Sequence, residues 1–182
     1  MTLFSSRLTR QPIAHDPAAA ADIAASFGDL PPDLRGLLAN TAGCSSFLKD
    51  LMRREGAWLR AALAVSPEDA LDAVMAELPA LGLDMLPSAL RRAKRRVALL
   101  TALADLGGVW RLEEVTAALT HLADTAVDLA IKALVADEIR RGKLPGATPD
   151  DASTGAGMVA LAMGKMGAGE LNYSSDIDLV CL

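Results

Sequence analysis

Aromatic residues are scarce in this chain of 182 residues and make up only 3% of it. Hydrophobic residues as a whole reach 52%, so a buried core has to be built mainly from Leu, Ala, Val and Met. Alanine favours helix because it loses no side-chain entropy there. The composition therefore predicts a mainly α-helical protein, with a length that allows one domain or one domain and part of a second.

Cysteine is also rare, and Cys44 and Cys181 show neither a metal-ligand spacing nor a disulfide framework. A reducing compartment suits such a chain, and we expect the cytoplasm. No run of 18 apolar residues is long enough to suggest a transmembrane helix. Arg7 and Arg10 are not followed by an apolar stretch, since Asp16 interrupts it, so no secretory signal and no membrane association is expected.

Positive charge is in the minority, with a formal net charge of -5 and a pI of about 5.0. This balance argues against a general nucleic-acid binder, and no nucleic-acid partner is expected. One basic run nevertheless stands out, comprising Arg91, Arg92, Lys94, Arg95 and Arg96. Such a run forms either a solvated helix face or a contact for an acidic partner, and the sequence leaves both open.

Helix-start signals recur through the first part of the chain. Asp16 precedes Pro17, and Ser45 and Ser66 precede further apolar runs, as N-cap residues do. Two longer helices are predicted over about 88–106 and 112–141. Residues 1–141 are therefore predicted to form a helical N-terminal region.

The second long helix has the most regular pattern. Its apolar residues recur in alternating steps of three and four, which describes one helix face: Leu112, Val115, Leu119, Leu122, Ala126, Leu129 and Ala133. Val127, Ile131 and Leu134 widen this stripe towards the C-terminal end, so that half is predicted to be buried on two sides.

Composition changes after this helix. Residues 142–157 are rich in Gly, Pro, Asp and Ser and predict a linker or loop. An apolar run over 158–163 and another over 176–182 then suit two strands separated by a glycine-rich loop. Two strands alone are rarely stable, so we expect the chain to be the front part of a larger protein.

Asp176 and Asp178 carry the clearest chemistry. In a strand, residues i and i+2 point to the same face, which would set the two carboxylates side by side. Their mutual repulsion is relieved by a hard cation such as Mg²⁺, which prefers oxygen ligands. Taken alone, such a pair is more often merely solvated.

The loop before this pair contains Gly164, Gly167 and Gly169 and allows backbone N–H groups to approach phosphate oxygens. Neither the P-loop pattern nor G-x-G-x-x-G fits. The order of strand, glycine loop and Asp-x-Asp instead resembles the polymerase-beta-type nucleotidyltransferase signature. Lys165 departs from it, because a small residue is usual at that position.

The whole string GKMGAGELNYSSDIDL, residues 164–179, resembles the first nucleotidyltransferase motif of the bacterial glutamine synthetase adenylyltransferase family, unusual lysine included. The stretch from about Leu90 to Thr116 is also similar to that family's helical region. The resemblance implies a helical N-terminal region followed by the start of an α/β polymerase-beta-type nucleotidyltransferase domain over 158–182.

The resemblance also implies an activity. Members are long proteins with two nucleotidyltransferase domains that use Mg²⁺ and ATP or ADP, with glutamine synthetase as substrate and a PII-type signal protein as regulator. By position, this chain resembles the half that uses phosphate to release ADP from adenylylated tyrosine. Asp176 and Asp178 would be the catalytic metal ligands, and Gly164, Lys165, Ser174 and Ser175 would lie near the nucleotide phosphates.

Members of the wider nucleotidyltransferase class usually place a third carboxylate on a later strand. We therefore expect the chain by itself to be inactive. Two alternatives stay open at this point: a non-catalytic helical interaction fragment, and a nucleotidyltransferase that acts on another substrate.

Overall fold

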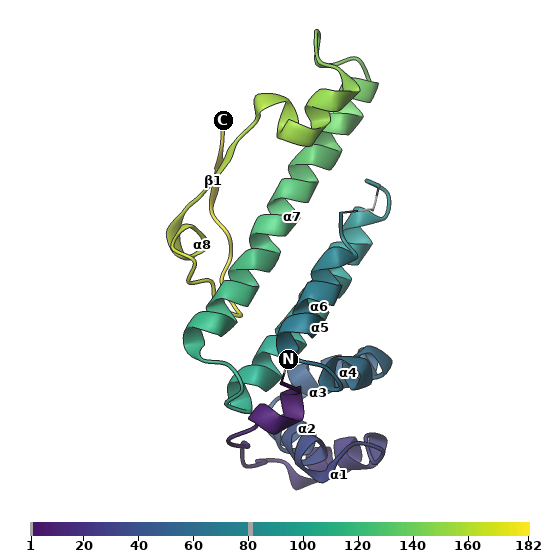
Figure 1. Cartoon of the computed structure of the whole chain (residues 1–182), viewed down its shortest axis with the longest axis vertical. Helices are drawn as coiled ribbons and strands as arrows, with labels where there is room; N and C mark the ends of the chain where they lie inside the picture. Colours follow the sequence, from purple (N-terminus) through teal and green to yellow (C-terminus); the bar gives the residue numbers. More distant parts are fainter. Residues whose placement is uncertain (1, 80–81) are drawn as a thin grey trace.

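The computed structural model describes residues 2–79 and 82–182 and confirms a mainly α-helical chain (Figure 1). Short helices gather at one end of the molecule, and two long helices run side by side away from them. The short elements are η1 (Phe4–Arg7), α1 (Pro17–Ser26), α2 (Pro32–Cys44), α3 (Ser46–Arg54), α4 (Gly56–Leu63) and α5 (Pro67–Ala76). The long helices are α6 (Leu86–Leu106) and α7 (Leu112–Arg140).

The predicted N-caps are confirmed by their hydrogen bonds. The Asp16 carboxylate accepts from the backbone N–H groups of Ala18 and Ala19 at 2.9 and 3.0 Å. The hydroxyl groups of Ser45 and Ser66 each accept from the amide three residues later. Each bond satisfies a backbone donor that the first helical turn leaves without a partner, so these helix starts are set by local sequence.

Aliphatic side chains form the core, as the composition predicts. The side chains with no exposed surface include Ile23, Leu37, Leu38, Met52, Leu59, Val97, Leu99, Leu100 and Leu103. These side chains come from α1 to α4 and from α6, so α6 joins the short helices into one hydrophobic cluster.

Residues 4–10, here called the N-terminal strap, cross the turn between α6 and α7. The amide of Phe4 donates to the Val65 carbonyl, and the amide of Thr9 donates to the Gly107 carbonyl, each at 3.0 Å. Phe4 itself is fully buried. The strap is therefore part of the fold. In a disordered N-terminal segment, these groups would be exposed to solvent.

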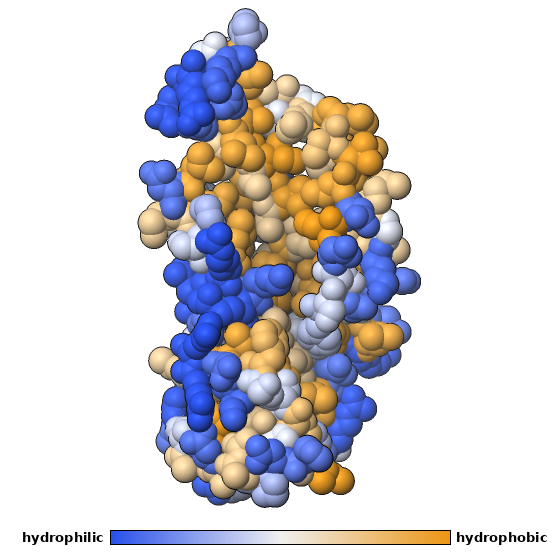
Figure 2. Space-filling model, turned by 180° about the vertical axis from the view of Figure 1, so that it is seen from behind, coloured by the Kyte–Doolittle hydropathy of each residue, from blue (hydrophilic) through white to orange (hydrophobic). Residues whose placement is uncertain are grey.

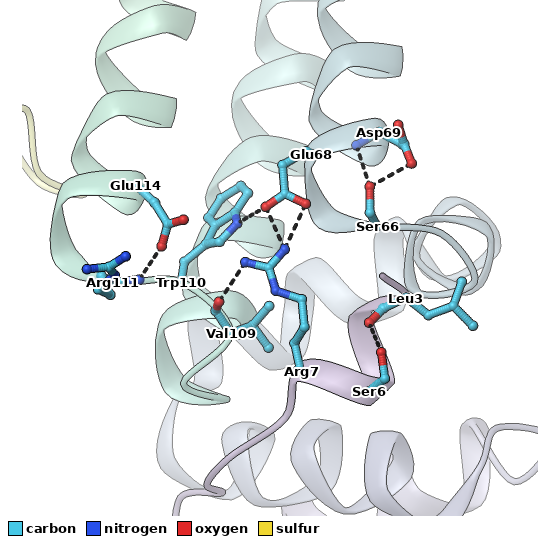
Figure 3. Close-up of polar contacts among 10 residues, drawn as sticks. All are labelled: Leu3, Ser6, Arg7, Ser66, Glu68, Asp69, Val109, Trp110, Arg111 and Glu114. Carbon is cyan, nitrogen blue, oxygen red and sulfur yellow. Dashed lines mark hydrogen bonds and ion pairs between the residues drawn. The ribbon is translucent and has the colours of Figure 1, made fainter. Parts of the chain in front are cut away.

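A polar cluster around Glu68 holds the strap in place (Figure 3). Arg7 Nη1 donates to both carboxylate oxygens of Glu68 at 2.7 and 2.8 Å, and Arg7 Nη2 donates to the Val109 carbonyl at 2.9 Å. The Trp110 indole N–H donates to Glu68 at 2.6 Å. Burial opposes ionisation of Glu68, but the hydrogen bonds from Trp110 and Arg7 outweigh it and lower the pKa of this carboxyl.

A second acidic residue, Glu55, connects the turn between α3 and α4 to α6. The Arg95 and Arg96 guanidinium groups donate to its two oxygens at 2.8 and 3.1 Å. Arg92 and Arg96 also pair with Glu77 at the end of α5. Three members of the basic run are thus used inside the fold.

The outer half of α7 differs from the prediction of burial on two sides. Val127 and Ile131 are half-buried, and Leu134 is 56% exposed. The prediction was wrong because an apolar stripe does not fix how many neighbours a helix has. Here, η2 (Pro149–Gly157) packs along α7, where Gly155 lies against Ile131, and leaves Leu134 in solvent.

The helix η2 lies inside the segment 142–157 that was predicted to be a linker or loop. Residues 142–148 do form turns and irregular structure. Pro149 follows Thr148, whose amide donates to the Asp151 carboxylate at 2.6 Å and so caps the helix. This local cap, together with packing on α7, turns half of the predicted loop into a defined element.

The chain then forms an antiparallel hairpin beside α7 (Figure 1). Its strands are β1 (Ala160–Ala162) and β2 (Leu179–Cys181), and α8 (Gly164–Gly167) follows β1 directly. Met166 and Leu171 are buried in the main hydrophobic cluster, which fixes the hairpin to the helical region. Within the described part of the chain, no helix is long and apolar enough to cross a membrane.

Candidate functional site

The hairpin register places Asp178 beside the start of the glycine loop. Ala162 lies opposite Leu179, and the ladder continues for one more step, with the Met163 amide donating to the Asp178 carbonyl at 2.9 Å. Gly164 follows Met163 and opens α8. Two parts of the predicted motif, separated by more than ten residues, are thereby brought together.

The strands are shorter than the sequence predicted, and Asp176 and Asp178 both precede β2. The prediction put them in a strand over 176–182, whereas the described strand begins at Leu179. The ladder ends at Asp178 because the opposite chain turns into α8 after Met163. Asp178 thus lies at the end of the ladder and Asp176 two residues beyond it.

The loop that carries Asp176 is anchored on α7. The Leu171 amide donates to the Thr120 hydroxyl at 3.3 Å, and both residues are buried. Asn172 Oδ1 then accepts from the Ser174 amide at 3.2 Å and from the Ser175 hydroxyl at 2.7 Å. These bonds shape a tight turn immediately before Asp176.

The two ends of α8 favour glycine for different reasons, lack of space at Gly167 and a positive φ of 57° at Gly164. A Cβ added at Gly167 would overlap the Ala162 carbonyl oxygen, so the return of the chain past β1 needs a residue without a side chain. A Cβ added at Gly164, by contrast, would meet nothing within 4 Å. The backbone at Gly164 is therefore accessible to a ligand.

The other predicted site residues are also accessible. Lys165, Ser174, Asp176 and Asp178 are exposed and Ser175 is half-buried. Within residues 2–79 and 82–182, neither the two carboxylates nor the Lys165 ammonium takes part in a side-chain hydrogen bond or ion pair. The hydroxyl of Ser175 is the exception, since it is committed to Asn172.

Two unpaired carboxylates two residues apart are suitable donors for Mg²⁺, a hard cation that takes oxygen ligands and retains several waters. The described residues contain no group of three or more His, Cys, Asp or Glu side chains that could hold a metal. Asp176 and Asp178 would be the protein ligands of a cation here, because their carboxylates are exposed oxygen donors. The same-face placement expected of a strand is not met, since neither residue lies in β2.

The sequence did not identify Thr120, which lies within the apolar stripe of α7. The sequence shows only a hydroxyl among apolar neighbours. The structure leaves Thr120 7% exposed, and a polar group buried to this extent requires a partner. Its partner, the amide of Leu171, is 51 residues away. The anchor of the site thus depends on a long-range contact.

Comparison with known proteins identifies the family. The model described as "Glutamate-ammonia ligase adenylyltransferase" matches residues 36–182, which is most of the chain. The chain belongs to this family. The match includes the helical region as well as the motif, so the two parts of the chain are features of one family.

Several relatives are named bifunctional glutamine synthetase adenylyltransferase/adenylyl-removing enzyme. The protein of Rhodopseudomonas palustris is 44% identical over 165 residues, which is 88% of this chain and 17% of the relative. That of Bradyrhizobium diazoefficiens is 43% identical over 170 residues, covering 91% of this chain and 17% of the relative.

The relative from Xanthobacter autotrophicus is 43% identical over 153 residues, covering 82% of this chain and 16% of the relative. This member of the adenylyltransferase family thus spans about a sixth of the length of these relatives. No solved structure matches the chain.

Proposed function

We propose that residues 158–182 contribute the first metal-binding and phosphate-binding residues of a nucleotidyltransferase site that acts on adenylylated glutamine synthetase. The observation that carries this proposal is the hairpin register, which sets Asp178 beside the open backbone at Gly164. The names of the relatives support the substrate. The motif's resemblance to the adenylyl-removing half supports the direction of the reaction.

In that direction, a phosphate oxygen attacks the phosphorus of the adenylyl group, a P–O bond forms, and the bond to the tyrosine oxygen breaks. The products are ADP and free tyrosine. Bound Mg²⁺ would neutralise charge that develops on the phosphate oxygens. Asp176 and Asp178 would hold the cation, while the backbone at Gly164 and the Lys165 ammonium would bind phosphate oxygens.

The serines act mainly through the shape of the loop. The Ser175 hydroxyl donates to Asn172, so the turn that presents Asp176 depends on it. Ser174 stays exposed and provides a hydroxyl for the nucleotide. Cytoplasmic localisation and regulation by a PII-type signal protein belong to the same proposal.

The proposal is tested by Asp176→Asn and Asp178→Asn in the native full-length protein. Each change removes one charged metal ligand, and we expect phosphate-dependent release of ADP from adenylylated glutamine synthetase to fall about 100-fold or more. Asp50→Asn, at an exposed position on α3, is the matched control and should retain activity.

Adenylylation in the forward direction should persist in both variants, since the family resemblance assigns it to a separate domain. Normal removal activity in either variant would contradict the metal assignment. The 182-residue chain alone should show no turnover, because its described residues supply only two of the carboxylates that such a site needs. Turnover of another adenylylated substrate, with none of glutamine synthetase, would favour a different substrate class.

A further inference from the structure

A groove runs between α6, α7 and the loop that carries Asp176. It has a volume of about 570 Å³. Its floor is apolar and is formed mainly by Leu90, Ala98, Leu119, Leu122, Ala126 and Leu171. In the view of Figure 2, apolar surface is hollowed along the middle of the molecule, with strongly hydrophilic side chains along one border.

One border of the groove is basic. Arg91 and Lys94 line it, and a spacing of three residues puts them on the same face of α6. Both are exposed, and in the part of the chain that the structure describes neither forms an ion pair within 4 Å. The basic run is therefore divided: Arg92, Arg95 and Arg96 bind acidic residues of the fold, while Arg91 and Lys94 have no internal partner.

Another part of the lining belongs to the proposed site. Tyr173, Ser175 and Asp176 line the groove there, together with Ile177. Tyr173 is 44% exposed, and partial burial raises the pKa of its hydroxyl to about 12. The phenol is neutral at physiological pH with or without this shift. The lining of the groove thus includes a proposed metal ligand and two cations that form no ion pair within the described residues.

The lining indicates which part of a substrate would occupy the groove. Gly164 and Lys165, which would bind phosphate oxygens in the proposed function, are not part of it, whereas Ser175 and Asp176 line one end of it. Its floor is apolar and would bury apolar side chains of a substrate, while its polar groups, such as Arg91, Lys94 and Tyr173, lie among the other lining residues. A protein substrate that presents a modified tyrosine to Asp176 must also place the residues next to that tyrosine somewhere nearby.

We propose that the groove binds the segment of the protein substrate next to the modified tyrosine, and that Arg91 and Lys94 bind a carboxylate of that segment. This inference rests on the proposed function and adds the chemistry of the docking segment, which is apolar with an acidic residue. Exposed cations of this kind act through complementary charge and contribute modestly at each position.

The test is the double variant Arg91→Glu and Lys94→Glu in the native full-length protein. We expect the KM for adenylylated glutamine synthetase to rise about tenfold, with kcat and the KM for inorganic phosphate changed less than about twofold. The control is Arg35→Glu with Arg54→Glu, which makes the same change in net charge at positions outside the groove. It should leave all three constants unchanged.

Raising the salt concentration should increase the KM of the wild type towards that of the groove variant, because screening weakens exposed charge pairs. If the double variant loses its fold, seen as a lowered Tm, Arg91→Gln with Lys94→Gln replaces it, with an expected rise of about threefold.

An unchanged KM for the protein substrate would overturn the inference while leaving the function intact. A rise confined to the KM for phosphate would also overturn it, by showing that the cations bind a small anion. If the wild type releases no ADP from adenylylated glutamine synthetase, the proposed function and this inference both fail.

Discussion

The helical region and the C-terminal hairpin are both rich in aliphatic residues but bury them to very different extents. Leu100 in α6 has no exposed surface, whereas Leu161 in β1 is 47% exposed and Val180 in β2 is 44% exposed. The hairpin contacts the core through Met166 and Leu171 and through one face of its strands. The helical region is thus stabilised by its own core, while the proposed site lies in a part of the molecule with few buried residues, where local opening costs less free energy.

The largest expected difference between the two regions concerns a single leucine in each. Leu100→Ala should lower the free energy of unfolding by about 3 kcal/mol, because it opens a cavity in a packed core. Leu161→Ala should lower it by less than about 0.5 kcal/mol, since that side chain is half in solvent. Urea denaturation of both variants, followed by circular dichroism, measures the contrast. Equal losses would show that the hairpin is as well packed as the helices.

The second largest effect concerns the ion pairs of Glu55, which lie within the helical region. Burial opposes ionisation of Glu55, but the hydrogen bonds from Arg95 and Arg96 outweigh it and hold the pKa of this carboxyl below its usual value. Glu55→Gln should lower the free energy of unfolding by about 2 kcal/mol at neutral pH.

The pH dependence of that loss follows from the direction of the shift. A carboxyl with a lowered pKa in the folded state stabilises the fold above its unfolded pKa and loses this contribution as pH falls through the folded value. The gap between the wild type and Glu55→Gln should therefore be constant near neutrality and shrink in acid. Urea titrations across this pH range test it, and a gap that widened in acid would contradict the assignment.

The smallest effect should be confined to the site. Thr120→Val removes the acceptor of the buried Leu171 amide and should lower the free energy of local opening by about 1 kcal/mol. Hydrogen exchange at Leu171 and its neighbours should accelerate, with little change in α6. Thr116→Val is the control, because that hydroxyl donates only to the Glu113 carbonyl of its own helix. Acceleration spread evenly over the whole chain would mean that the two regions open together.

Local signals made much of the helical region predictable. Asp16, Ser45 and Ser66 indicate helix starts because their side chains accept hydrogen bonds from nearby backbone N–H groups. Donor and acceptor lie within a few residues of each other, so a short stretch of sequence predicts the bond. The contacts that join the helices are different. Glu55 meets Arg95 from 40 residues away, and no periodicity in the sequence encodes that pairing.

For the candidate site, the structure tests the predicted geometry, while the predicted chemistry stays a prediction. The sequence proposed Gly164, Asp176 and Asp178 from their spacing, but the strand that was to hold both aspartates begins only at Leu179. Strand length depends on how far a partner chain runs alongside, which composition does not show. The positions of Glu55 and Glu77 likewise decide which cations of the basic run form internal ion pairs, and the sequence does not show these positions.

The strap also has a consequence for synthesis of the protein. Arg7 donates to the Val109 carbonyl, 102 residues further along the chain. A ribosome releases residues 4–10 long before it makes the α6–α7 turn, so Phe4 stays without its native cover throughout that interval. Closing so long a loop carries an entropic cost that is offset only when Glu68, Val109 and Trp110 are all in place. The strap therefore docks only after Trp110 has emerged, and nascent chains arrested before that point should retain a protease-sensitive strap.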